Sequence, residues 1–373
     1  MSIHTFMSTF RQLISVLVLI VCLTAGANAV GNCTIYNGGI PTECSVRCFD
    51  YGVNGDVMDP GIAAATYLNS VFPVYGSICT TKWILEIANS KFPLNTLRVN
   101  WLQEADGDPI LMNINDIIIH TTQITSIQPG AFALPGLGAS VQRLAIYYNK
   151  LDRINGGITL GLTSLSSFEW VGNGVIKSVD SDTVLPFRTS LAVLQISDCG
   201  FADATVVANI TGCASAGSLP NVRTLELSFN PGPGLTVLGN SHLSQMTGVF
   251  SMYLWNSEIQ HLQDNTVFDS VAASIQTIHL SNNMLTTMVN GTLDSIILQN
   301  KQRFTIALKG NPWHCDCQLA WLQLVLRLGL GNVELADAPT CASPDSERGK
   351  LLIEADMTST CDPLVVPPPL DIC

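Results

Sequence analysis

Four consecutive residues, His314-Cys315-Asp316-Cys317, are the side chains of this sequence best suited to bind a metal ion. Zinc sites usually separate their cysteines by two or more residues and need a second pair of ligands to complete a tetrahedron. In a secreted chain, cysteines spaced as Cys-x-Cys more often form disulfides. We therefore expect neither a metal nor a cofactor here.

The usual catalytic and nucleotide-binding motifs are missing from the sequence. It contains no nucleophile elbow, metalloprotease helix, phosphate-binding loop or dinucleotide fingerprint. Of the six histidines, His4 precedes residue 30, and none of the other five has a neighbour that suggests a proton relay. The sequence predicts a protein without enzymatic activity.

A nine-residue pattern recurs along most of the chain and places the remaining candidate residues. Apolar residues occupy its first, fourth and sixth positions, and the ninth is Asn or a small residue, as in Val141-Leu144-Ile146-Asn149. The ninth positions of eight copies fall at residues 122, 149, 173, 199, 230, 257, 283 and 311. Such a period predicts an α/β fold, a leucine-rich repeat solenoid (horseshoe) with a parallel concave sheet and a disulfide-stabilised cap at each end.

Each position of the pattern has an expected role. The ninth side chain turns inward and bonds backbone groups that would otherwise be buried without partners, for which Asn is best suited. Thr122, Cys199 and Ser257 take this position in three repeats. Phe132 and Phe268 sit where this repeat class inserts a phenylalanine into the core. A second apolar set should line the outer arc, namely Leu151/Ile154, Ile259/Leu262 and Leu285/Met288.

The third, fifth, seventh and eighth positions point outward and form the candidate binding surface. Aromatic side chains at such positions are the usual anchors of protein interfaces. Their clustering favours a binding role over simple coverage of a sheet. We expect Glu169, Glu226 and Asp116 to select polar or basic groups of the partner. The predicted partner-binding residues are a main cluster of Phe229, Glu226, Tyr253, Trp255 and His279, and a second group of Tyr147 and Tyr148.

The start of the chain has the features of a secretory signal peptide. Arg11 precedes an apolar stretch over residues 13–25, and Ala27-Asn28-Ala29 offers the small residues that signal peptidase requires. We expect cleavage after residue 29 and a secreted, extracellular protein without membrane insertion. The formal net charge of −12 argues against nucleic acid and anionic membranes as partners. The predicted glycosylation sites are the Asn-x-Thr sequons at Asn32, Asn209 and Asn290.

Eleven of the twelve cysteines follow the expected signal peptide, and the oxidising compartment favours disulfides among them. Cys199 and Cys213 either form a disulfide, which we favour, or Cys199 remains a thiol in the role of Asn. Cys373 would then be left over, either to link two copies as a homodimer or to be capped by a small thiol. Near the N-terminus lie four more cysteines, Cys33, Cys44, Cys48 and Cys79. Four cysteines can pair into two disulfides in three ways, and the sequence does not select among them.

The segment from Asn311 to Cys361 resembles the cysteine-rich C-terminal cap of extracellular leucine-rich repeat proteins such as Slit, Toll-type receptors and small proteoglycans. The similar residues are Asn311-Pro312-Trp313-His314-Cys315-Asp316-Cys317, Leu319, Trp321, Leu322, Cys341 and Cys361. The resemblance implies the disulfides Cys315–Cys341 and Cys317–Cys361. We expect the apolar face of a short helix at Trp321 and Leu322 to cover the last repeat.

The whole chain also resembles secreted arthropod proteins named after the non-catalytic leucine-rich subunit of a shrimp luciferin monooxygenase. The shared features are a cysteine-rich start, Phe72-Pro73 after a helix, imperfect repeats and the terminal Cys-x-Cys. Asp59-Pro60 is suited to begin that helix, which we expect to end before Pro73. The resemblance implies no oxygenase activity, because the name describes the partner of one member.

These observations predict five regions and one main function. The regions are a signal peptide (1–29), a cysteine-rich N-terminal cap (30–80), the repeats (81–311), a cysteine-rich C-terminal cap (312–361) and a Pro-rich tail (362–373). We expect the chain to bind an extracellular protein ligand through its concave face, in recognition or adhesion. The alternative is a non-catalytic, stabilising subunit of a secreted enzyme complex.

Overall fold

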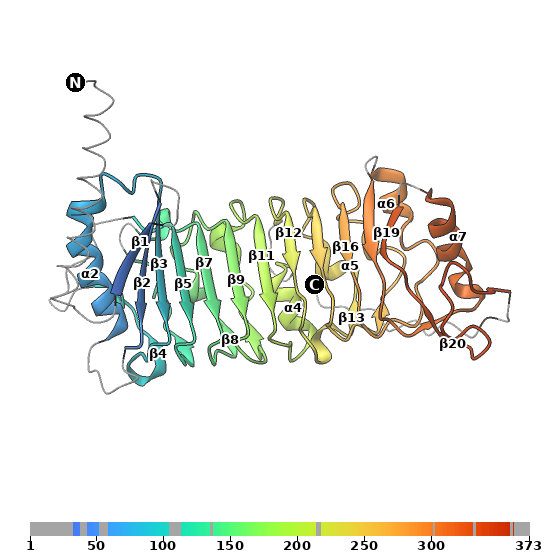
Figure 1. Ribbon diagram of the computed structural model, residues 1–373, viewed down its shortest axis with the longest axis horizontal. Coiled ribbons are helices and arrows are strands. Elements are labelled where there is room, and N and C mark those ends of the chain that lie inside the picture. Colours follow the sequence, from blue (N-terminus) through green and yellow to red (C-terminus); the bar gives the residue numbers. More distant parts are fainter. Residues whose placement is uncertain are drawn as a thin grey trace, which may run out of the picture.

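The computed structural model describes residues 33–37, 43–51, 59–103, 113–134, 137–213, 218–300, 303–330, 333–358 and 361. The expected signal peptide, Asn32 and the Pro-rich tail lie outside these residues. The chain forms an elongated solenoid whose strands lie side by side in one long sheet (Figure 1). Only β1 and β2 pair antiparallel in this sheet, and the strands from β2 onward pair in parallel.

The sheet takes one strand from each repeat, two from the N-terminal cap and one from the C-terminal cap. In spatial order its strands are β1 (Cys33–Asn37), β2 (Glu43–Phe49), β3 (Lys82–Ala88), β5 (Asp116–His120), β7 (Arg143–Tyr147), β9 (Ser167–Val171), β11 (Val193–Ser197), β12 (Thr224–Glu226), β14 (Ser251–Tyr253), β16 (Thr277–His279), β17 (Phe304–Ala307) and β19 (Val333–Asp337).

Short elements complete each repeat on the opposite side of the sheet. The two-stranded pairs are β4 (Thr96–Leu97) with β6 (Ser126–Ile127), β8 (Arg153–Ile154) with β10 (Ser178–Val179), and β13 (Val237–Leu238) with β15 (His261–Leu262). The helices between repeats are α3 (Leu137–Ser140), α4 (Ala204–Ile210), α5 (Asn240–Leu243) and α6 (Asp294–Gln299). Single turns of 3-10 helix are η2 (Pro93–Asn95), η3 (Gly156–Ile158), η4 (Leu185–Phe187) and η5 (Pro233–Leu235).

The core confirms the expected roles of the apolar positions. Phe132 and Phe268 are completely buried, and the outer-arc residues Leu151, Ile259 and Leu285 are at most 1% exposed. One hydrophobic cluster runs from Cys33 to Met357 through every repeat. Because each repeat buries its apolar residues against its neighbours, the solenoid has a continuous core rather than a series of separate ones.

The ninth-position residues form the predicted ladder inside the turns. Asn283 illustrates it: its Nδ2 donates to the carbonyl oxygens of Leu254 (2.8 Å) and Leu280 (3.0 Å). Its Oδ1 accepts from the backbone N–H groups of Ser257 (2.9 Å) and Ile259 (3.2 Å). One amide therefore satisfies four backbone groups that the core would otherwise bury without partners.

The N-terminal cap is built on two disulfides and one helix. The disulfides are Cys33–Cys48 and Cys44–Cys79. Helix α2 (Pro60–Tyr75) lies at this end of the sheet (Figure 1). Asp59 caps it as predicted, accepting from the N–H of Gly61 at 2.8 Å. The expected stop before Pro73 is wrong, because Pro73 lies in the last turn of the helix, which ends at Tyr75.

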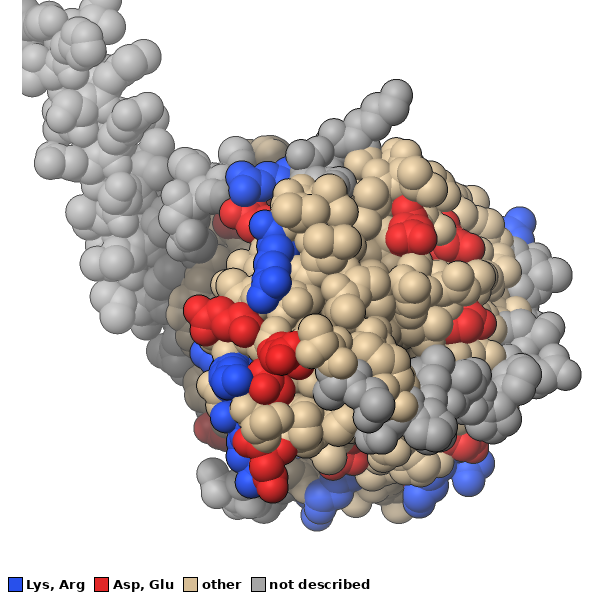
Figure 2. Space-filling model, turned by 90° about the vertical axis from the view of Figure 1, so that its right-hand side faces the viewer, with Lys and Arg blue, Asp and Glu red and all other residues tan. Residues whose placement is uncertain are grey.

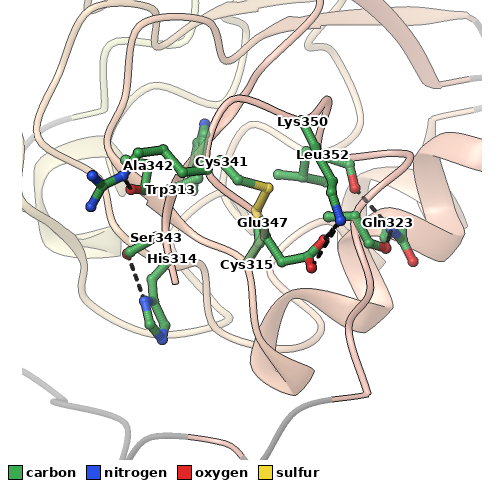
Figure 3. Close-up of a disulfide and its surroundings, with 12 residues drawn as sticks. Trp313, His314, Cys315, Gln323, Cys341, Ala342, Ser343, Glu347, Lys350 and Leu352 are labelled. Atoms are coloured by element: carbon green, nitrogen blue, oxygen red, sulfur yellow. Dashed lines mark hydrogen bonds and ion pairs between the residues drawn. A yellow bond between two sulfur atoms is a disulfide. The ribbon is translucent and has the colours of Figure 1, made fainter. Parts of the chain in front are cut away.

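The C-terminal cap has the disulfides that the resemblance implied, Cys315–Cys341 and Cys317–Cys361. Around the first of these, β18 (Trp313–His314) pairs with β20 (Cys341–Ser343), and His314 Nδ1 lies 2.7 Å from Ser343 Oγ (Figure 3). Because Cys315 and Cys317 are both in disulfides, neither offers a free thiolate to a metal ion. No group of three or more potential metal ligands occurs among the described residues.

Helix α7 (Ala320–Leu328), which follows η6 (Cys317–Leu319), covers the last repeat with its buried residues Leu322 and Val325. Gln323 Nε2 fixes the cap loop by donating to the carbonyl oxygen of Leu352 at 2.8 Å (Figure 3). It also donates to the carbonyl oxygen of Ala355 at 2.8 Å. Viewed from this end, the cap presents a largely uncharged surface (Figure 2). Leu328, in α7, is an exposed apolar residue.

The favoured disulfide between Cys199 and Cys213 is wrong. Cys199 is a free, buried thiol, whereas Cys213 is disulfide-bonded to a different cysteine. Because Cys199 holds the ninth position, its side chain turns inward, where Sγ lies 3.2 Å from the carbonyl oxygen of Ser197 and 3.7 Å from that of Trp170. It therefore fills the role of Asn, the alternative that the sequence left open.

This environment makes Cys199 unreactive, which gives a first testable prediction. Burial raises the pKa of the Cys199 thiol to about 12, and the residue is only 7% exposed. Since the thiolate is the reactive form, iodoacetamide at pH 8 should label Cys199 only after denaturation without reductant. Mass spectrometry of the alkylated peptides checks this. Labelling of the native chain as fast as that of the unfolded chain would contradict it.

Candidate functional site

The fifth positions of the repeats form one row across the outward side of the main sheet, which we call the sheet face. In register along this row lie Glu169, Gln195, Glu226, Tyr253 and His279. Neighbouring strands are about 4.8 Å apart, so side chains in the row are lateral neighbours. The sequence pattern alone therefore brings Glu226, Tyr253 and His279 together from three repeats.

Four rings form a continuous group at the β12–β16 part of the sheet face, which we call the aromatic cluster: Phe229, Trp255, His279 and Tyr253. The ring centroids of Phe229 and Trp255 are 4.4 Å apart, with the rings inclined by 63°. Trp255 and His279 are separated by 5.7 Å, and His279 and Tyr253 by 6.3 Å. Such spacings are those of favourable aromatic contacts. The structure thus brings the predicted main cluster together.

Phe229 reaches Trp255 from a backbone conformation that disfavours its side chain. The eighth position of each repeat is left-handed, and Phe229 has φ of +56° there. This conformation costs an L-residue with a Cβ roughly 1–2 kcal/mol, and Gly, Asn and Asp tolerate it best. Most other repeats have tolerant residues in this position, namely Asn89, Gly172, Asp198, Asn256, Asn282 and Gly310, whereas Thr121 and Tyr148 share the left-handed conformation of Phe229. The Phe229 side chain is only partly buried, since 40% of it is exposed.

The second predicted group does not join the aromatic cluster. Tyr148 is 56% exposed, and its ring lies over Gly172, where a Cβ would overlap it. Strands β9 and β11 separate β7, which precedes Tyr148, from β12. Tyr148 is therefore an isolated exposed ring on the sheet face.

Tyr147 belongs to a closed polar network. Arg143 donates to both carboxylate oxygens of Glu169, at 2.7 and 2.8 Å, and to the Tyr147 hydroxyl at 3.0 Å. The Tyr147 hydroxyl also donates to Glu169. Burial, followed by this bond to Glu169, raises the pKa of Tyr147 to about 12. Burial alone would raise the pKa of Glu169, but the hydrogen bonds from Arg143, Tyr147 and Ser167 outweigh it and lower that pKa.

Two of the three carboxylates expected to select a partner are therefore already paired within the chain. Glu169 has Arg143, and the buried Asp116 has Lys82, whose Nζ lies 2.8 Å from its Oδ2. Glu226 differs: its Oε1 accepts a hydrogen bond from the N–H of Ser228 at 3.3 Å. Glu169 and Asp116 thus have ion-pair partners within the chain, whereas Glu226 forms no ion pair with a described residue, and the selection of a partner by these carboxylates stays a prediction.

His279 completes the cluster as a neutral ring. Burial lowers its pKa, and the nearby charge of Asp337 opposes this only in part. Its Nδ1 and the Oγ of Ser281 are buried without a hydrogen-bond partner among the described residues. This feature could not be predicted from the sequence, because the spacing of residues does not show which buried polar atoms lack a hydrogen-bond partner.

The glycosylation sequons differ in their surroundings. Asn209 lies in α4, and its Nδ2, the atom to which a glycan would attach, donates to the carbonyl oxygen of Val179 at 2.6 Å. Asn290 is exposed in a turn. Glycosylation at Asn290 fits the structure, whereas at Asn209 it would require the loss of that hydrogen bond.

Comparison with known proteins supports the architecture, although no protein-family model matches the sequence. Trophoblast glycoprotein of Macaca fascicularis is 26% identical over 68% of this chain and 61% of its own length. Leucine-rich repeat-containing protein 3B of Bos taurus is 27% identical over 38% of this chain and 58% of its own length. The chain thus spans less than two thirds of each of these relatives.

Solved structures show the same fold. The crystal structure of human trophoblast glycoprotein superposes with a TM-score of 0.53 at 20% identity, over 66% of this chain and 87% of that one. Within the described part of the chain, no helix is long and apolar enough to span a membrane. The narrower resemblance to the shrimp luciferin monooxygenase subunit stays a prediction. A single nine-residue pattern builds the parallel sheet, and the relatives share its architecture: the chain is a leucine-rich repeat protein.

Proposed function

We propose that the chain is an extracellular, non-catalytic protein that binds a protein partner through its sheet face, with the aromatic cluster as the anchor. The observation that carries the proposal is the unbroken series of ring contacts from Phe229 through Trp255 and His279 to Tyr253. Tyr and Trp are enriched among the residues that dominate binding energies. A group of partly exposed rings, one of them held by a strained backbone, calls for a functional explanation.

Two further observations support an extracellular setting, and the net charge indicates the kind of partner. The disulfides at both ends are typical of oxidising compartments. The net charge of −12 favours basic partners and disfavours nucleic acid. The similarity to trophoblast glycoprotein agrees with this setting.

The test is to recover the native protein from its secretions without reductant, size it and identify what travels with it. The same recovery is repeated with Trp255→Ala and with Leu328→Ala, which removes a side chain that is 62% exposed on α7. Loss of a partner with Trp255→Ala alone supports the sheet face as the interface. Loss with Leu328→Ala alone places the interface at the C-terminal cap and contradicts the proposal.

The form in which the partner is recovered also distinguishes the two roles. A stoichiometric second polypeptide with enzymatic activity would favour the role of stabilising subunit. A ligand that binds reversibly would favour recognition or adhesion. The homodimer through Cys373 was expected on the basis of a Cys199–Cys213 disulfide that the structure does not have. Sizing without reductant still tests it, because such a dimer separates into single chains only when reductant is added.

A further inference from the structure

Along the sheet face, buried and half-buried carboxylates come with their own cations. Glu86 Oε1 lies 2.8 Å from both Arg47 Nη2 and His120 Nε2. Asp116 and Glu169 have the partners described above, Lys82 and Arg143. Removing a charged carboxylate from water is costly unless it is paired with a positive charge. These ion pairs offset the cost of burying the carboxylates.

Glu226 is the exception. It occupies the same row as Glu86 and Glu169 and is half-buried, yet it forms no ion pair with a described residue. Its lateral neighbours in the row are Gln195 and Tyr253, and neither carries a positive charge. Burial raises the pKa of Glu226, and the hydrogen bonds from Ser228 offset this only in part.

The side chains beside Glu226 suit a cation. Tyr253 lies directly opposite Glu226 on the adjacent strand β14. Phe229 follows Glu226 by three residues, just beyond the end of β12, and its ring contacts that of Trp255. Aromatic faces attract cations through their quadrupole, and Trp and Tyr do so best. An unpaired carboxylate at the edge of an aromatic cluster therefore attracts a positive charge in two ways.

We propose that Glu226 and the aromatic cluster receive an arginine side chain of the partner protein. The planar guanidinium can donate two parallel hydrogen bonds to the Glu226 carboxylate while its face stacks on a neighbouring ring, which a lysine ammonium cannot do. A metal ion does not fit, since the described residues offer no group of three ligands. The inference rests on the proposed function and adds the chemistry of the group that is bound.

The overall charge agrees with such a partner. A chain with a formal net charge of −12 draws basic surfaces toward itself. On binding, the guanidinium would supply Glu226 with the counter-ion that Arg143 supplies to Glu169. The proposed contact between the two proteins is therefore of the same kind as the Arg143–Glu169 ion pair within this sheet.

The test uses random peptides displayed on phage and selected on the full-length chain. Each selected peptide is then synthesised in two forms. One form keeps its arginines, and in the other an arginine is replaced by citrulline, its neutral isostere. Dissociation constants are measured for the wild-type chain and for Glu226→Gln. Glu334→Gln is the matched control, because it makes the same change in charge on β19 at an exposed carboxylate that pairs with Arg303.

The proposal predicts peptides enriched in arginine, with about a tenfold to 100-fold loss of affinity on Glu226→Gln or on citrulline replacement. The two losses should not add when combined, and Glu334→Gln should change little. Peptides that need Trp255 but neither arginine nor Glu226 would overturn this inference and leave the proposed function standing. Peptides that bind the Trp255→Ala chain equally well would overturn the proposed function itself.

Discussion

A Trp255→Ala chain is expected to bind its protein partner about 100-fold more weakly than the wild type. Trp255 lies at the centre of the aromatic cluster and contacts both Phe229 and His279, so truncation removes the largest ring and separates the others. Central tryptophans in interfaces commonly cost about 2–4 kcal/mol on replacement by alanine, and about 2.7 kcal/mol corresponds to 100-fold. Titration calorimetry with the recovered partner gives the dissociation constants.

The same substitution should affect folding far less than binding. Trp255 is only partly buried on the sheet face, and the spine of the repeat is formed by Met252 and Leu254 beneath it. We expect the free energy of unfolding to fall by no more than about 1 kcal/mol. Leu328→Ala is the control for the loss of an exposed apolar side chain elsewhere. Equal affinities for the Trp255→Ala and wild-type chains would show that the cluster is not the anchor.

Replacing Asn283 by alanine is expected to lower the free energy of unfolding by about 3–5 kcal/mol. Four backbone groups lose their partner: the N–H groups of Ser257 and Ile259 and the carbonyl oxygens of Leu254 and Leu280. A buried polar group left unsatisfied costs about 1–3 kcal/mol, although some relaxation will reduce the sum. Urea denaturation followed by circular dichroism measures the change.

The neighbouring residue provides the control for this prediction. Asn282 is exposed, and its φ of +55° suits glycine. Asn282→Gly should therefore change the free energy of unfolding by no more than about 0.5 kcal/mol. A loss below about 1 kcal/mol for Asn283→Ala would show that the ladder is not essential to the stability of the repeats.

The repeats could be predicted from the sequence because the spacing that defines them is local. The alternation within nine residues decides which side chains enter the core, and the confirmed positions of Phe268 and Asn283 follow from it. Cys199 was assigned wrongly because the general preference of exported cysteines for disulfides was given more weight than its ninth position. That position directs its side chain inward, to the carbonyl oxygens of Ser197 and Trp170.

The binding surface could be predicted in its aromatic part but not in its charges. Tyr253, Trp255 and His279 hold outward positions that the pattern defines directly. The cation beside Asp116 was missed because Lys82 lies in a segment whose repeat register is irregular in sequence. The pair of Arg143 and Glu169 could have been found, since their third and fifth positions lie on adjacent strands.

The most direct test of the sheet face as the binding surface is to measure stability and affinity together on a Phe229→Asn chain. Asparagine tolerates the left-handed backbone at φ of +56° better than phenylalanine, so unfolding should occur at the same temperature or higher. The ring that contacts Trp255 is lost, and partner affinity should fall by about tenfold or more. A chain that is equally stable and binds its partner with unchanged affinity would contradict the account.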